Sequence, residues 1–197
     1  MPPAIGIGWW DMPALSLSSQ ETLFAIARQS LRNYLEGKKG RDPMTHPEML
    51  SSELLAKRGC FVTLKKYGAL RGCIGTFVAD QPLYQAVARM AAAAAFDDPR
   101  FPRLSESEFE MIKIEISILG ELERMGSPEE LEVGRHGILV KSGKKSGTFL
   151  PEVAVEQHWS RDEFIRTCAR EKAGLSPEEF ERAEFFLYRV DKIAEKE

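Results

Sequence analysis

Hydrophobic and polar positions change their period several times along the chain, and each period predicts a type of element. From Ser18 to Gly37, apolar side chains recur every three or four positions, which is typical of an amphipathic helix. Ser18, followed three residues later by Glu21, predicts a capping box at the first turn of this helix. Between residues 112 and 119, four isoleucines alternate with mostly polar side chains, which predicts a strand with one buried face.

Two strands joined by a tight turn are predicted to precede an alanine-rich helix. Residues 60–65 and 69–77 show the alternation of strands, and the Tyr-Gly dipeptide at 67–68 predicts the turn between them. Asp80 is expected to cap the next helix, which contains five consecutive alanines and must end before Pro99. Alanines favour helix and let backbones approach closely, so we expect this helix to be closely packed.

The second half of the chain is predicted to carry shorter elements. The pattern indicates strands and helices at residues 136–140, 147–150, 153–159, 160–174 and 185–190. Strands and helices are mixed without a regular strand–helix–strand repeat, and hairpins are frequent. The predicted fold class is therefore α+β, with a mainly antiparallel sheet and packed helices. Residues 1–14 are interpreted as an N-terminal arm and residues 15–193 as a single domain.

Composition places the chain among globular proteins and excludes one class of function. Of its 197 residues, 43% are hydrophobic and 29% are charged, so a core can form without disulfides or metals. The formal net charge is −3, with 27 Lys and Arg against 30 Asp and Glu. This balance excludes a strongly basic protein whose main role is to neutralise phosphates, so nucleic-acid binding is the least favoured function.

The cysteines predict the compartment of the protein, and the motifs predict whether it holds a metal or a cofactor. Cys60, Cys73 and Cys168 are odd in number and widely spaced, which predicts free thiols in a reducing compartment. The sequence has neither a signal-like start nor an apolar run long enough to span a membrane, so we expect a cytoplasmic location and no membrane partner. Paired-cysteine zinc spacing and the dinucleotide fingerprint are missing, and the histidines are isolated, so we expect no metal and no cofactor.

The most informative stretch of the sequence is residues 70–77. Gly72 and Gly75 lie inside a predicted strand, where glycine usually marks a bulge or a close approach by backbone or ligand. Regular alternation places Arg71 and Cys73 on one face, where the guanidinium would favour the thiolate and could hold a carboxylate or phosphate through two hydrogen bonds. The same residues are also consistent with a buried structural cysteine beside a salt-bridged arginine.

Residues 70–77 resemble the signature of the AMMECR-type domain family. Further blocks that resemble the family follow in the family's order, at residues 92–102, 114–119, 134–137, 150–154, 159 and 164–175. The resemblance covers roughly residues 20–190. One position departs from it, because Glu152 stands where the family pattern has glutamine, and no role is carried over to that residue.

The resemblance implies more about the fold than about the activity. It implies two unequal lobes that form a cleft, the larger lobe being built from both chain ends around an antiparallel sheet. The biochemical activity of the family is not established. Microbial relatives are often encoded beside a Memo-type metal protein and a radical-SAM enzyme, which implies a shared pathway and, as partner, one of these proteins or an unknown small molecule.

The first functional hypothesis is an enzyme, or a substrate-handling component of one, with its site in the cleft. Cys73 would be the nucleophile or a thiolate ligand, Arg71 an anion clamp and His136, in a glycine-flanked loop, the candidate base. Glu115 is a further catalytic candidate on the polar face of its strand. The other residues expected to line the substrate site are Gly72, Gly75, Asp98 and Arg100.

The second hypothesis is a non-catalytic adaptor that binds a protein partner. The partner would dock in the cleft or on the arm that carries Trp9 and Trp10. Arg71 would then be structural and would pair with a carboxylate such as Asp98. Both hypotheses remain open at the level of the sequence, and binding should survive Cys73→Ser only under the second.

Overall fold

The chain folds into two compact units, each with its own hydrophobic core. The computed structural model describes residues 15–43 and 47–196. The first unit comprises the described residues up to Leu119 and those from Asp191 onward, and the second comprises Gly120–Val190. The larger unit is thus built from both ends of the chain, as the resemblance implied. The expected arm at residues 1–14, with its two tryptophans, lies outside the described residues.

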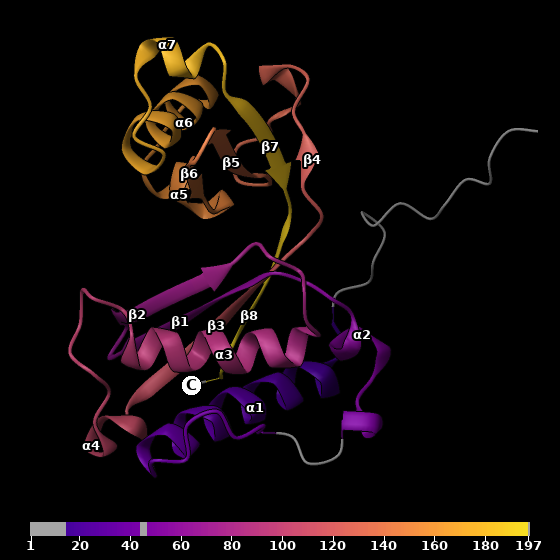
Figure 1. Ribbon diagram of the computed structural model, residues 1–197, viewed down its shortest axis with the longest axis vertical. Helices are drawn as coiled ribbons and strands as arrows, with labels where there is room; N and C mark the ends of the chain where they lie inside the picture. The colour runs from indigo at the N-terminus through magenta and orange to yellow at the C-terminus, as the bar shows by residue number, and fades with distance from the viewer. Residues whose placement is uncertain (1–14, 44–46, 197) are drawn as a thin grey trace, which may run out of the picture. The chain divides into compact units, whose positions relative to one another are not determined.

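The first unit packs helices against one face of a four-stranded sheet with the strand order β2-β1-β3-β8 (Figure 1). The helix α3 contacts β1 and β2, and α1 contacts α3. In chain order, the elements of this unit are α1 (Leu17–Leu35), the 3-10 turn η2 (Pro47–Met49), α2 (Ser52–Leu55), β1 (Cys60–Lys66), β2 (Ala69–Thr76), α3 (Leu83–Phe96), α4 (Glu106–Phe109), β3 (Ile112–Leu119) and β8 (Val190–Ala194).

The second unit contains a four-stranded sheet with the order β4-β7-β5-β6, whose paired strands are antiparallel. Together the two units confirm the predicted α+β class. The elements of the second unit are β4 (Glu123–Arg124), the 3-10 turn η3 (Pro128–Glu130), β5 (Gly137–Ser142), β6 (Lys145–Phe149), α5 (Pro151–Glu156), α6 (Arg161–Thr167), the π-helical turn η4 (Cys168–Lys172), α7 (Pro177–Phe180) and β7 (Glu184–Tyr188).

The helix starts differ from the predicted ones at two places. The first helix is capped by Ser16 rather than Ser18, because the Ser16 hydroxyl accepts the hydrogen bond of a first-turn amide at 3.3 Å. The helix α3 begins after Pro82 without a side-chain cap, so the prediction that Asp80 caps it is wrong. The short elements β4, α4 and β8 were not predicted, since two to five residues carry too little periodicity.

A one-residue bulge in the β1–β2 hairpin decides where the side chains of β2 point. Lys65 pairs with Leu70, but the next residue, Leu64, pairs with Gly72, which leaves Arg71 as the extra residue. Because successive side chains of a strand point to opposite faces, one extra residue moves all the later side chains to the other face. The bulge or close approach that was predicted at Gly72 and Gly75 is therefore confirmed.

Beyond the bulge, β2 alternates between the two faces of the first sheet. Gly72 lies against α3, and a Cβ there would come within 2.1 Å of the carbonyl oxygen of Ala94. The expected close packing of the alanine-rich helix is thus confirmed. Cys73 pairs with Thr63 on the opposite side. We call this side, which points away from α3 and α1, the polar face, and the other side the helix face.

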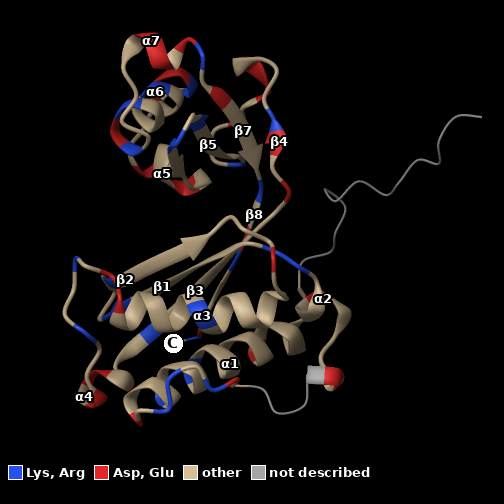
Figure 2. Ribbon diagram, in the orientation of Figure 1, with Lys and Arg blue, Asp and Glu red and all other residues tan. Residues whose placement is uncertain are grey.

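Two observations concern membrane-spanning helices and the distribution of charge. Across residues 15–43 and 47–196, none of the helices joins the length to the apolar character that crossing a bilayer demands. Basic and acidic residues are interspersed along both units instead of collecting in one large region (Figure 2). The charge pattern of the described residues therefore agrees with the nearly balanced composition.

We expect Gly72→Ala to destabilise the first unit, because the added methyl group would collide with the backbone of α3. The free energy of unfolding should fall by about 1–3 kcal/mol, the usual cost of overpacking. Urea unfolding followed by circular dichroism measures the change. Gly120→Ala is the control, since the nearest atom to its added Cβ would lie at 3.4 Å, an ordinary contact. Equal midpoints for the two variants would contradict this packing argument.

Candidate functional site

A row of polar side chains crosses the polar face of the first sheet at Cys73. The strand β1 pairs with both β2 and β3, and its register places Cys73, Thr63 and Glu115 side by side on adjacent strands. The Thr63 hydroxyl donates a hydrogen bond to the Cys73 sulfur at 3.3 Å. Cys73 and Glu115 are two strand spacings apart, about 10 Å. Two of the predicted catalytic residues therefore share a face, with a hydroxyl group between them.

Glu115 is held in this row by two lysines. The Lys65 ammonium lies 2.5 Å from one carboxylate oxygen, and the Lys192 ammonium lies 3.3 Å from the other. Burial by itself raises the pKa of Glu115, but the hydrogen bonds and charges of the two lysines outweigh burial and keep the pKa below its ordinary value. Glu115 is therefore ionised at neutral pH and is a weak proton acceptor.

The ring of Phe61 borders the row on one side. Phe61 pairs with Gly75 across the hairpin, and a Cβ at Gly75 would lie 2.2 Å from that ring. Phe61 also contacts Phe77 edge to face, with the two ring centroids 5.6 Å apart. Gly75 thus lets an aromatic side chain lie across β2 beside Cys73, which gives the site an apolar boundary.

The loop after α3 covers the edge of β2 at Cys73. The Cys73 amide donates to the Asp98 carboxylate at 2.9 Å, and the Arg100 guanidinium donates to the Cys73 carbonyl at 3.2 Å. Because β2 is an edge strand, these backbone groups have no strand neighbour on that side, and the two side chains take its place.

Asp98 and Arg100 also hold each other in a two-point contact. Nε of Arg100 donates to one oxygen of Asp98 at 2.9 Å, and Nη2 donates to the other at 2.7 Å. The side chain of Asp98 is only 1% exposed. These bonds from Arg100, helped by the backbone amide of Cys73, keep the pKa of Asp98 well below its ordinary range although burial opposes them. Three of the predicted site residues therefore meet at one point of the edge.

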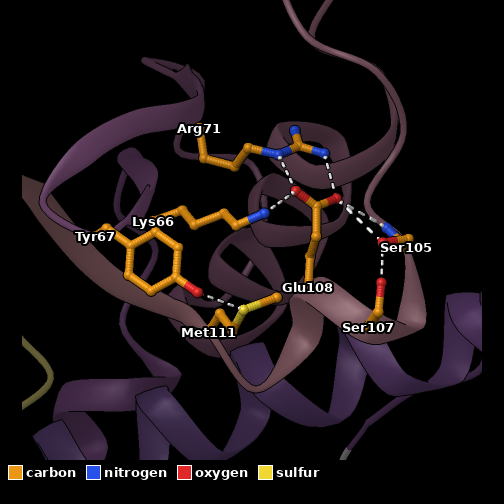
Figure 3. Close-up of polar contacts among 7 residues, drawn as sticks. All are labelled: Lys66, Tyr67, Arg71, Ser105, Ser107, Glu108 and Met111. Atoms are coloured by element: carbon orange, nitrogen blue, oxygen red, sulfur yellow. Dashed lines mark hydrogen bonds and ion pairs between the residues drawn. The ribbon is translucent and has the colours of Figure 1, made fainter.

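Arg71 belongs to a separate cluster on the helix face. Its side chain is only 8% exposed, and Nε and Nη2 donate to the two oxygens of Glu108, at 3.2 and 3.0 Å (Figure 3). The expectation that Arg71 and Cys73 share a face is wrong, because the bulge moves Arg71 out of the alternation. The alternative partner for Arg71, Asp98, is also wrong, since that carboxylate pairs with Arg100.

Glu108 is the centre of this second cluster. Lys66 donates to it at 2.9 Å, and the backbone amide and hydroxyl of Ser105 donate at 3.3 and 3.2 Å (Figure 3). The bonds from Arg71 and then those from Lys66 hold the pKa of Glu108 far below its ordinary value. Nη1 of Arg71 is buried, and no described residue accepts a hydrogen bond from it.

His136 lies in the second unit, directly before β5. Its Nδ1 accepts a hydrogen bond from the backbone amide of Glu132 at 3.1 Å. Burial is the main reason why the pKa of His136 is lowered, and the nearby Glu132 partly offsets it. Gly134, with a φ of 83°, supplies the backbone conformation that glycine favours, whereas Gly137 makes room for the ring of Tyr188. The contacts of His136 within this unit are therefore those of a loop histidine.

The three cysteines differ in exposure. All three are free thiols, as predicted, but Cys60 and Cys168 are buried, and Cys73 is partly exposed. Burial raises the pKa of both Cys60 and Cys168 to about 12. Cys73 is thus the thiol of this chain that a reagent or substrate can approach without unfolding.

A metal site and a surface hollow are two further features that bear on the candidate site. Within that part of the chain, no three histidine, cysteine or acidic side chains gather closely enough to hold a metal ion. A hollow of about 420 Å³ lies between α1 and the segment that ends β8, with Phe24, Arg28 and Glu195 among its lining residues. It contains none of the predicted site residues.

The sequence prediction missed several members of both clusters. Thr63 and Lys65 lie in a segment that was predicted as a strand, but nothing linked them to Cys73 or Glu115. Lys192 and Glu108 belong to β8 and α4, which were not predicted as elements. Charged residues in the short segments beside strand ends are the signal that could have found them.

Comparisons with known proteins identify the family of this two-unit α+β protein. The AMMECR1 family model matches residues 24–193. Protein MK0488 of Methanopyrus kandleri is 42% identical over 173 residues, which are 83% of this chain and 81% of that protein. Protein TK0174 of Thermococcus kodakarensis is 39% identical over 169 residues, 80% of each chain. The chain therefore belongs to the AMMECR1 family, as its motifs predicted.

A solved structure is similar over nearly the whole chain. It is the crystal structure of the uncharacterized protein PH0010 from Pyrococcus horikoshii, which is 33% identical and aligns with a TM-score of 0.82. The alignment covers 92% of this chain and 94% of that one. The relative is thus similar in both sequence and fold.

We expect Glu108→Gln to lower the free energy of unfolding by about 3 kcal/mol, because it leaves the charge of Arg71 buried without a counterion. The effect should depend on pH. A carboxylate whose pKa lies below its ordinary value of 4.5 stabilises the fold above that value, and this contribution is lost as the pH falls. The wild type should therefore lose more stability than the variant between about pH 6 and pH 3.

Urea unfolding at several pH values measures both parts of this prediction. Glu106→Gln is the control, because Glu106 lies on the same short helix and is exposed. If Glu108→Gln and Glu106→Gln unfold at the same urea concentration at every pH, the ion pair contributes no stability.

Proposed function

We propose that the chain is a cysteine-dependent enzyme, or the substrate-handling component of one, which acts on a small molecule at the polar face of its first sheet. The observation that carries the proposal is the position of Cys73. It is the partly exposed thiol of the chain, it accepts a hydrogen bond from Thr63, and its backbone is held by the Asp98–Arg100 pair.

The proposed step is a nucleophilic substitution at the sulfur of Cys73. The S–H bond breaks and its proton passes to water, and the sulfur electron pair forms a bond to an electrophilic carbon of the substrate. The bond between that carbon and its leaving group breaks, and the leaving group departs with the electron pair. The reaction needs neither an oxidant nor a reductant.

The neighbours of Cys73 support such a step by positioning. The bond from Thr63 orients the sulfur, and the edge contacts of Asp98 and Arg100 keep its backbone in place. Glu115, paired with two lysines, contributes a fixed charge about 10 Å away rather than a base. Arg71, the extra residue of the bulge, pairs with Glu108 on the helix face and takes no part in the step.

The partner is proposed on the family resemblance alone. Because microbial relatives are often encoded beside Memo-type and radical-SAM proteins, we propose that the substrate of Cys73 is exchanged with a protein of one of these two kinds.

The adaptor alternative draws support from a different part of the same hairpin. Tyr67 at the turn is 82% exposed, and Leu70 is 45% exposed. A contact surface for another protein would use exposed apolar side chains such as these. In that case Cys73 would be unreactive, and its substitution would leave binding intact.

We expect Cys73 of the folded protein to react with iodoacetamide about tenfold faster than a thiol of the same chain unfolded in urea, as reactive cysteines do. Cys60 and Cys168 should react only after unfolding, because both are buried. Peptide mass mapping after timed alkylation measures each thiol separately.

Thr63→Val is the matched variant, since it removes the hydroxyl that bonds the sulfur and keeps the shape of the side chain. It should slow the alkylation of Cys73 without changing the protection of the other two thiols. A Cys73 that reacts no faster in the folded than in the unfolded chain would overturn the enzyme proposal and favour the adaptor.

A further inference from the structure

The arginine that the motif offers as an anion clamp already holds a carboxylate of its own chain. Glu108 accepts hydrogen bonds from Nε and Nη2 of Arg71, and the remaining nitrogen, Nη1, is buried. A nitrogen without exposed surface does not reach a ligand from solution. Any anion that binds near Cys73 must therefore be held by another cation.

Arg100 has the exposure that Arg71 lacks. Its side chain is 55% exposed, although Nε and Nη2 are held by Asp98 and by the carbonyl of Cys73. Within the described part of the chain, Nη1 donates no hydrogen bond, so two N–H groups of a fixed guanidinium remain available. The ring of Phe101, 5.5 Å from the guanidinium carbon, further restricts its movement.

Arg100 is also close to the thiol. It donates a hydrogen bond to the backbone carbonyl of Cys73 at 3.2 Å, so its guanidinium lies against the residue that carries the thiol. The hydrogen bonds with Asp98 raise the pKa of Arg100, so its guanidinium keeps its charge.

We propose that Nη1 of Arg100 binds a carboxylate group of the substrate, so the substrate class is a small carboxylate-bearing electrophile. The inference rests on the proposed function, because it assigns the substrate of that same thiol. Asp98 already neutralises one positive charge at this point, which favours a singly charged carboxylate over a doubly charged phosphate. Charge-assisted N–H bonds of this kind position a ligand as well as attract it.

The test compares two alkylating reagents that differ by one carboxylate. Iodoacetate and iodoacetamide attack the same sulfur, so a change in the exposure of Cys73 alters both rates and leaves their ratio unchanged. The ratio of the iodoacetate to the iodoacetamide rate is measured for Cys73 by mass mapping and compared with the ratio for glutathione. We expect the ratio to be about fivefold higher for Cys73, the size of one charge-assisted bond at an exposed site.

The decisive variant is the double substitution Asp98→Asn with Arg100→Gln. It removes the guanidinium while keeping the net charge of the pair at zero. It also removes the contacts of this pair with the backbone of Cys73, but a change in the position of Cys73 alters both alkylation rates and leaves their ratio unchanged. The control is Asp97→Asn with Arg103→Gln, which removes the neighbouring exposed pair of the same loop. The ratio should fall to that of glutathione in the first double variant and stay at the wild-type value in the control.

The outcomes separate this inference from the function on which it rests. A wild-type ratio equal to that of glutathione overturns the inference even if the double variant does not fold. So does a raised ratio that survives the double substitution. If Cys73 shows no enhanced rate with iodoacetamide in the wild type, the proposed function itself fails. If Cys73 reacts fast with iodoacetamide but its rate ratio equals that of glutathione, only the assignment of a carboxylate substrate is overturned.

Discussion

One extra residue in the edge strand β2 determines which side chains the β1–β2 hairpin places on each face of the first sheet. Without the bulge at Arg71, regular pairing would set Cys73 opposite Val62, a buried residue of the helix face. With the bulge, Cys73 lies opposite Thr63 on the polar face. Gly72 directly follows the bulge, and its lack of a side chain lets the backbone of α3 pack against β2 at this point. The bulge thus decides on which side of the sheet the thiol lies.

The bulge also separates two charged networks that the motif brings together in sequence. On the helix face, Glu108 neutralises Arg71 in a setting where unpaired charge is costly. At the strand edge, Asp98 and Arg100 satisfy the backbone of Cys73 and prevent that position from pairing with another strand. The first network is closed and maintains the shape of the hairpin. The second leaves part of a guanidinium at the surface.

The sequence predicted the fold better than the site, for identifiable reasons. The isoleucine alternation of β3 and the hairpin turn at Tyr67 are local signals, and both elements were correctly predicted. The faces of β2 were not, because the alternation of residues does not show where a strand takes up an extra residue. The carboxylate partner of Arg71 was missed for a similar reason: α4 is a single turn whose position depends on the packing around Phe109. Patterns reveal elements, whereas pairings depend on tertiary contacts.

The discontinuous first unit has a consequence for biosynthesis. Its sheet needs β8, whose residues are translated only after the entire second unit has been made. The second unit is a continuous segment and can fold as it leaves the ribosome, while the edge of β3 still waits for its neighbour. Glu195, which closes β8 against Arg28 and the amide of Ile114, therefore bonds a side chain that was translated 167 residues earlier. A nascent chain stalled before this point would expose an open strand edge to chaperones.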